Sequence, residues 1–359
     1  MNPITYAALE ARLLDLIADP AALAGGISEE KFNFNSVALD VHRYQREYNT
    51  PYRQFCEFQH TPPPGELTDW RKIPAVPTGA FRHAALRTFP EAETLATFRT
   101  SGTTGEGFGS HHFCSLRLYE ASILQAWDAL GIARLRQVIL TQRPADAPHS
   151  SLCHMMGVLA ARVDEGPLPA QTWCMDAQGH LDFAAFRGAI EAGDPVLLLG
   201  TALAFLHLFE QLGHERIVLP PGSIAMETGG YKGTGRSLSK AALYARFGEA
   251  LGLEPGSILN EYSMTELSSQ WYTRGLGNPH TGPGWVRALV VDPLTGREAA
   301  EGESGVVRLF DLANLGSVFA VQTQDLAIRR GAGFELLGRA PGAAPRGCSI
   351  ALDEMLSAS

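Results

Sequence analysis

Lysine is scarce in this 359-residue sequence, and its distribution limits the chemistry of the chain. The four lysines are Lys31, Lys72, Lys232 and Lys240, so positive charge in the last third must come from arginine. The formal net charge of −9 argues against nucleic acid or an anionic membrane as the main partner. A nucleotide stays compatible with this charge, because it needs only one local positive site.

Paired cysteines and long apolar runs are also missing. The five cysteines are scattered without C-x-x-C spacing, which favours reduced thiols and a cytoplasmic protein. The N-terminus carries acidic side chains inside its apolar pattern, which is not typical of a signal peptide. No run approaches the roughly 18 apolar residues of a membrane-spanning helix, so we expect no membrane span.

Several common catalytic motifs do not occur. No glycine-lysine-serine or glycine-lysine-threonine sequence indicates a Walker A loop, and no G-x-S-x-G sequence indicates a hydrolase nucleophile. His111, His112 and Cys114 lie close together, but a fourth ligand at zinc-finger spacing is lacking. These residues alone therefore do not predict a metal cluster.

The pattern of apolar residues predicts an α/β protein. Helices are expected over residues 5–17 and, with a break near Pro51, over residues 31–59. Apolar strands then alternate with helices, which is typical of a largely parallel sheet. From about Trp285, short β runs separated by turn residues predict antiparallel hairpins. We divide the chain into an N-terminal helical region (1–64), an α/β nucleotide- and acyl-binding core (65–284), a β-rich subdomain (285–340) and a short tail (341–359).

A loop rich in glycine and hydroxyl side chains follows the β-prone run from Leu95 to Phe98. Its glycines let the backbone approach another group closely, and successive N–H groups in such a loop form a cradle for anions. A surface turn explains these residues equally well when they are considered alone. The loop residues in question are Ser101, Gly102, Thr103, Thr104 and Gly105.

The sequence Asn-Glu-Tyr-Ser-Met-Thr-Glu at 260–266 follows a predicted strand and combines an aromatic ring, hydroxyls and carboxylates. Tyr262 can stack on a flat base, Thr265 can donate to a phosphate, and Glu266 can hold a hard divalent cation. A loop of solvated acidic residues is the alternative interpretation of this stretch.

Three further features could take part in chemistry. A glycine turn at Gly229 and Gly230 precedes Lys232, and Asp325 lies between β runs where a carboxylate can bind both ribose hydroxyls. Arginine and cysteine follow near the end, and an adjacent arginine can lower a thiol's pKa. A plain turn, a surface aspartate and an inert cysteine are the respective alternatives. The last two candidates are Arg339 and Cys348, and the arginine that lies beside this cysteine is Arg346.

Together these motifs resemble the adenylate-forming superfamily, in the order that superfamily uses. Thr-Ser-Gly-Thr-Thr-Gly is similar to its phosphate loop, and Tyr-Ser-Met-Thr-Glu is similar to its Tyr-Gly-x-Thr-Glu motif. Within the superfamily the chain most resembles the acyl-protein synthetase (LuxE-type) family over about residues 65 to 350. This implies a large adenylating domain of acyl-CoA synthetase type, with parallel and mixed sheets plus an antiparallel β subdomain. We also expect the full mobile C-terminal domain of typical members to be missing.

The resemblance implies that ATP activates a carboxylic acid as an acyl-adenylate, whose acyl group then passes to a thiol. Ser101 to Gly105 would hold the ATP phosphates, and Gly229 and Gly230 would flank the adenine, on which Tyr262 would stack. Thr265 would touch the α-phosphate and Glu266 would bind Mg²⁺. The remaining implied roles are ribose binding for Asp325, a hinge position beside the ribose for Arg339, a cation for Lys232 and the acyl-carrying thiol for Cys348.

Several departures from the family pattern leave alternatives open. The loop continues without the usual lysine, so phosphate charge must be met by His111, Lys232 or an arginine. The acyl acceptor is Cys348, coenzyme A or a carrier-protein thiol, and a reductase or carrier protein is an expected partner. An acyl- or aryl-CoA ligase of phenylacetate-CoA ligase type and a non-catalytic nucleotide-binding subunit are the competing functions. For a fatty or other acyl chain, we expect a pocket that includes Phe81, His154, Leu203 and Met226.

Overall fold

The structure is a computed structural model that describes residues 4–23, 33–100, 107–162, 171–229 and 238–339. These residues divide into two compact units. The first unit comprises the described residues up to Ala129, the segment Met264–Ser269 and the residues from Pro279 onward. The second comprises Leu130–Ser263 and Gln270–Asn278. The chain thus leaves the first unit twice and returns to it twice.

The N-terminal helices confirm the sequence prediction, with one adjustment. The side chain of Thr5 caps α1 by accepting a hydrogen bond from the Ala8 N–H. The second helical region breaks at Asn49 rather than at Pro51, because Asn49 ends one helix and caps the next, where proline fits the first turn. The helices are α1 (Tyr6–Ile17), α2 (Pro20–Leu23), α3 (Phe34–Tyr48) and α4 (Thr50–Phe58).

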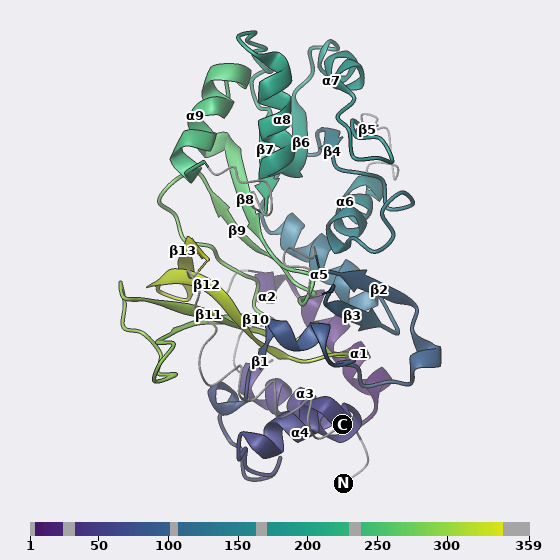
Figure 1. The fold of residues 1–359 in the computed structure, drawn as a ribbon, viewed down its shortest axis with the longest axis vertical. Coiled ribbons are helices and arrows are strands. Elements are labelled where there is room, and N and C mark those ends of the chain that lie inside the picture. Colours follow the sequence, from purple (N-terminus) through teal and green to yellow (C-terminus); the bar gives the residue numbers. More distant parts are fainter. Residues whose placement is uncertain (1–3, 24–32, 101–106, 163–170, 230–237, 340–359) are drawn as a thin grey trace. The chain divides into compact units, whose positions relative to one another are not determined.

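The first unit also contains a mixed five-stranded sheet (Figure 1). Its central strand, β12, pairs with β11 on one edge, and its other edge is shared by β1 and β13. The antiparallel hairpins predicted after Trp285 are present, whereas the parallel pairing of β1 was not expected. The strands are β1 (Val76–Pro77), β10 (Val286–Val291), β11 (Ser304–Asp311), β12 (Ala320–Arg330) and β13 (Gly333–Arg339).

A separate two-stranded hairpin in the first unit carries the glycine-rich loop. Strands β2 (Ala96–Arg99) and β3 (Ser110–Phe113) pair antiparallel, with Arg99 opposite Ser110. Residues 101–106 connect them and lie outside the described residues. Helix α5 (Arg117–Asp128) follows this hairpin in the sequence.

The second unit contains a six-stranded sheet in the order β5-β4-β6-β7-β8-β9, parallel except for β9. The strand β6 is apolar and almost fully buried, as expected for a strand covered on both faces. The edge strands β5 and β9 and the helix α7 were missed by the sequence analysis. The sheet strands are β4 (Arg136–Leu140), β5 (Thr172–Trp173), β6 (Val196–Thr201), β7 (Ile224–Thr228), β8 (Ile258–Tyr262) and β9 (Trp271–Arg274).

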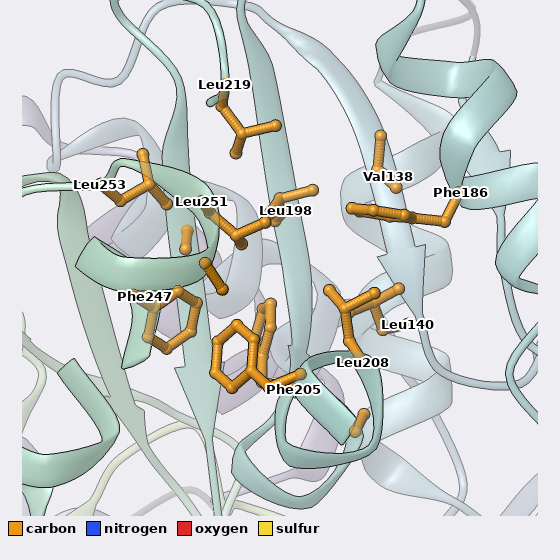
Figure 2. Packing of buried hydrophobic residues seen from close by; sticks show 14 of the residues in the cluster. Val138, Leu140, Phe186, Leu198, Phe205, Leu208, Leu219, Phe247, Leu251 and Leu253 are labelled. Atoms are coloured by element: carbon orange, nitrogen blue, oxygen red, sulfur yellow. The ribbon is translucent and has the colours of Figure 1, made fainter. Parts of the chain in front are cut away.

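Three helices, α7, α8 and α9, cover one face of this sheet and form a buried apolar cluster with its strands (Figure 2). Phe247 of α9 packs against Phe205 and Phe209 of α8, with ring centroids 4.7 and 5.1 Å apart. Gln137, whose side chain points to the other face of β4, donates to the Leu159 carbonyl of α6, so α6 covers that face. The helices are α6 (Ser151–Ala161), α7 (Phe183–Ile190), α8 (Ala202–Leu212) and α9 (Lys240–Leu251).

These layers confirm the α/β fold class with parallel and antiparallel sheets. The helix α9 ends at Gly252, and that glycine adopts the left-handed conformation (φ 69°) that favours glycine. None of the helices in the described residues combines the length and apolar character that crossing a membrane requires.

Candidate active site

The strands β2 and β3 hold the two ends of the glycine-rich loop together. The Thr100 N–H donates to the Gly109 carbonyl (2.9 Å), and the Gly109 N–H donates to the Thr100 hydroxyl (2.8 Å). A Cβ on Gly109 would lie 3.1 Å from the Thr100 methyl group, so this close approach favours glycine. Ser101 to Gly105 lie outside the described residues, but both ends of their loop are fixed.

A tight turn presents Thr265 and Glu266. The Leu267 N–H donates to the Met264 carbonyl (3.0 Å), which places Thr265 and Glu266 at the two central positions of a four-residue turn. Thr265 is half-buried and Glu266 is 8% exposed. This turn follows β8 in the sequence, and the division between the two units falls just before it.

Side chains from two other elements bind the carbonyls of this turn. The Nδ1 atom of His111, in β3, lies 2.8 Å from the backbone carbonyl oxygen of Thr265. The Nδ2 atom of Asn314 donates to the backbone carbonyl oxygen of Glu266 at the same distance. Both carbonyls, which an isolated turn would leave to water, therefore have protein partners.

A buried aspartate fixes the residues just after the turn. Asp311 is fully buried and accepts from the Ser268 N–H (2.8 Å) and from the Ser269 hydroxyl (2.7 Å). Burial raises the pKa of Asp311 to about 6, against the opposing effect of these hydrogen bonds. The Ser268 hydroxyl donates in turn to Oδ1 of Asn314 (2.7 Å), so one network holds both ends of the segment.

His111 does not supply the positive charge that the sequence analysis considered. Its side chain is 2% exposed and packs between the rings of Phe81 and Phe113. Burial lowers the pKa of His111 to about 4. The imidazole is therefore neutral at pH 7, with the Nδ1–H donating to the Thr265 carbonyl, which can only accept. The remaining candidates for that charge are Lys232, which lies outside the described residues, and arginine.

The second unit contains the proposed adenine-binding residues. Gly229 directly follows β7 and has a φ of 70°, in the left-handed region. Tyr262 ends β8, is 7% exposed and meets the Trp271 ring of β9 edge-on, with centroids 6.5 Å apart. Gly230 lies outside the described residues. The stacking and flanking roles of these residues stay predictions.

A polar cluster at the ends of β7 and β8 was missed by the sequence analysis. Lys240 donates to Oδ1 of Asn260 (2.9 Å), and Nδ2 of Asn260 donates to the Glu227 carbonyl. Burial raises the pKa of Glu227 to about 7, although the nearby Lys240 acts in the opposite direction. Glu261, the other carboxylate of the acidic motif, is buried and accepts from the Thr228 hydroxyl.

The structure brings the two proposed ribose-binding residues together. Asp325 of β12 lies opposite Arg339 of β13, and Nε of Arg339 is 3.6 Å from the Asp325 carboxylate. Asp325 also donates its N–H to the Thr323 hydroxyl. The sequence distance of 14 residues is therefore closed by an antiparallel hairpin.

The structure gives the positions of the four residues proposed for the acyl pocket, and their role in a pocket stays a prediction. Phe81 is 2% exposed and contacts His111, while Met226 is fully buried in β7. His154 in α6 and Leu203 in α8 are half-buried. Phe81 belongs to the first unit, and the other three residues belong to the second.

The described residues fit a magnesium–nucleotide site better than a metal site built by protein alone. Within them, no three histidine, cysteine, aspartate or glutamate side chains gather as a protein-built site requires. Mg²⁺ is commonly held by one or two carboxylates together with substrate phosphates and water. Glu266, whose side chain is 8% exposed, supplies one carboxylate that suits such an arrangement, and its Mg²⁺-binding role stays a prediction.

Comparison with known structures shows the fold. A 2-hydroxyisobutyryl-CoA ligase in complex with 2-HIB-AMP and CoA aligns with 85% of this chain and 74% of its own, at 16% identity and a TM-score of 0.64. ATP-bound MatB from Rhodopseudomonas palustris aligns with 68% of this chain at 18% identity and a TM-score of 0.50. This chain spans about half of the MatB chain, 48% of its length.

Comparison of sequences shows the family. A curated protein of Vibrio harveyi, named long-chain-fatty-acid–luciferin-component ligase, is 23% identical over an alignment 362 residues long, which covers 96% of this chain and 93% of that protein. The model of the family described as acyl-protein synthetase, LuxE, matches residues 4–357. The match includes the loop, the acidic motif and Cys348, and it confirms the resemblance inferred from these motifs. The chain belongs to the acyl-protein synthetase family LuxE.

Proposed function

We propose that this ligase uses ATP to activate a carboxylic acid as an acyl-adenylate. The acyl group then passes to a thiol. The observation that carries the proposal is the match to the acyl-protein synthetase family along almost the whole chain. The substrate class, a fatty or related acyl acid, is suggested by the name of the Vibrio harveyi relative.

In the first step, a carboxylate oxygen of the acid attacks the α-phosphorus of ATP, and pyrophosphate leaves. This step needs positioning and neutralisation of phosphate charge more than acid–base catalysis. Ser101 to Gly105 would bind the phosphates, and the Thr265 hydroxyl would donate to the α-phosphate. Mg²⁺, when bound by Glu266, would neutralise charge on the phosphate oxygens.

Further groups of the family pattern would hold the rest of the nucleotide. Tyr262 would stack on adenine beside Gly229 and Gly230, and Asp325 would accept hydrogen bonds from the ribose hydroxyls. Arg339, which is paired with Asp325, would lie beside the ribose, and Lys232 would contribute positive charge. These assignments come from the family pattern, and the Asp325–Arg339 pair supports them because it places both side chains together.

In the second step, a thiolate attacks the acyl carbon and AMP leaves, which gives a thioester. We favour Cys348 as the acceptor. Burial raises the pKa of each cysteine in the described residues, which keeps those thiols protonated at pH 7. Cys348 follows an arginine closely in the sequence, where a thiolate is favoured. A reductase or carrier protein would then receive the acyl group.

Labelling with a radioactive fatty acid tests the acceptor. In the presence of Mg²⁺ and ATP, we expect the wild-type chain to retain the label after denaturation and to lose it in neutral hydroxylamine. The Cys348→Ser variant should retain no label but should still form acyl-adenylate, while the control variant Cys114→Ser should label normally. Release of free acyl-CoA, with no protein label when coenzyme A is added, would instead identify a CoA ligase.

A further inference from the structure

The turn at Thr265 and Glu266 is held from both sides by buried side chains. Its two central carbonyls accept from His111 and Asn314, and the residues after it are bound by Asp311. The turn itself has one internal backbone hydrogen bond, between Leu267 and Met264. The direction in which the Thr265 hydroxyl and the Glu266 carboxylate point therefore depends on these outer contacts.

His111 joins this turn to the hairpin that carries the glycine-rich loop. It lies in β3, two residues after Gly109, where the loop closes on Thr100. Its ring is fixed by Phe113 at a centroid distance of 4.1 Å and by Phe81 at 5.7 Å. A rigid ring on a short strand therefore sets the distance between the loop's base and the acidic motif.

Asn314 holds the turn from the other side and is itself fixed. Its Nδ2 atom donates to the carbonyls of Glu266 and Val318, and its Oδ1 atom accepts from the Ser268 hydroxyl. Gln45 of α3 donates to the Asn314 carbonyl at 2.9 Å. Asn314 therefore binds one side of the turn, while His111 joins the turn to the hairpin.

We propose that His111 is a positioning residue that holds the Thr265–Glu266 turn in register with the phosphate-loop hairpin through its hydrogen bond to the Thr265 carbonyl. This inference rests on the proposed function, because the turn and the loop are taken to bind the same magnesium–nucleotide. Residues that orient a metal ligand or a reacting group commonly change activity 10- to 100-fold when they are replaced.

A packing role is the competing explanation, and two substitutions separate it from positioning. In His111→Asn the amide nitrogen replaces Nδ1 as the donor but leaves much of the ring's volume empty. In His111→Leu more apolar volume is kept but the donor is lost, so the Thr265 carbonyl is left unpaired. The matched control is His112→Leu on the same strand, whose ring contacts the Thr97 hydroxyl instead.

Carboxylate-dependent ATP–pyrophosphate exchange provides the first readout, measured per folded molecule. We expect His111→Leu to lower kcat about 10- to 100-fold and to raise the Mg²⁺ concentration needed for half-maximal rate. His111→Asn should recover kcat to within about threefold of wild type, and His112→Leu should leave it unchanged. Equal kcat values for the Asn and Leu variants, or a wild-type kcat in His111→Leu, would overturn the proposal.

Amide hydrogen exchange provides a second readout that does not depend on activity. We expect peptides covering 264–269 to exchange faster in His111→Leu than in wild type or His111→Asn, with peptides of the second unit unchanged. If the wild-type chain shows no pyrophosphate exchange, the proposed function fails, and this measurement alone decides the positioning role. Equal exchange of this peptide in all variants would reject it.

Discussion

At the scale of single residues, the described part of the chain keeps several titratable side chains buried and uncharged. His111 and His42 are neutral at pH 7 because burial lowers the pKa of each to about 4. His42 is fully buried and shares a 2.9 Å hydrogen bond between Nδ1 and the Tyr52 hydroxyl. Its Nε2 atom has no hydrogen-bond partner among the described residues. Such a group makes the stability of the fold depend on pH.

Replacing His42 with glutamine tests this dependence away from the proposed site. Between pH 6.5 and 4 the unfolded chain takes up a proton at His42 and the folded chain does not, so the histidine stabilises less as pH falls. The free energy of unfolding of wild type, relative to His42→Gln, should therefore fall by up to about 3 kcal/mol over this range. Urea denaturation at several pH values measures this difference, and a constant difference would contradict a neutral buried His42.

At the scale of elements, the β2–β3 hairpin gives the glycine-rich loop its geometry. Its base is closed by the Thr100 hydroxyl, which accepts from the Gly109 N–H. A loop that binds a charged ligand through its backbone gains affinity when its ends are preorganised, because less ordering entropy is lost on binding. The hydroxyl of Thr100 should therefore matter more for ATP than for stability.

Replacing Thr100 with valine removes this acceptor while keeping the shape of the side chain. The net value of one such hydrogen bond is about 1 kcal/mol, so we expect KM for ATP to rise about fivefold. Thr100→Ser keeps the hydroxyl and should behave as wild type. Pyrophosphate-exchange kinetics with varied ATP measure both variants, and an unchanged KM in Thr100→Val would show that the base of the hairpin does not govern ATP binding.

The sequence predicts elements with strong periodicity and misses contacts made between distant segments. The helix ending at Gly252 and the β-rich region after Trp285 follow from local signals. The anchoring roles of Asp311 and Asn314 depend on partners more than 40 residues away, which no local pattern reveals. A usable signal was present, because these two polar residues interrupt an otherwise apolar stretch and buried polar groups need partners.

Some of the candidate site residues can also be recognised from local sequence, and others only from the fold. The motifs at 101–105 and 260–266 can be recognised by composition and order, whereas the cluster around Glu227 and Lys240 cannot. The ion pair of Asp325 and Arg339 requires knowledge of the β12–β13 register, which includes a bulge. His111 was considered as a cation because its burial is not visible in the sequence.

At the scale of the whole molecule, the motifs are distributed between two units that the chain enters more than once. In the second unit, Gly229 follows strand β7 and Tyr262 ends strand β8. The first unit contains the turn with Thr265 and Glu266. Only three residues separate Tyr262 from Glu266 in the sequence. The acidic motif at 260–266 therefore continues from the second unit into the first.

Carboxylate-dependent exchange of labelled pyrophosphate into ATP tests the central claim, ATP-dependent activation of an acid, most directly. With a panel of fatty, aryl and small acids, we expect the purified chain to exchange label only when a suitable acid and Mg²⁺ are present. Glu266→Gln should lower the exchange rate at least about 100-fold, because it removes the proposed metal ligand. Absence of exchange with every acid, from a folded chain that binds ATP, would contradict the account.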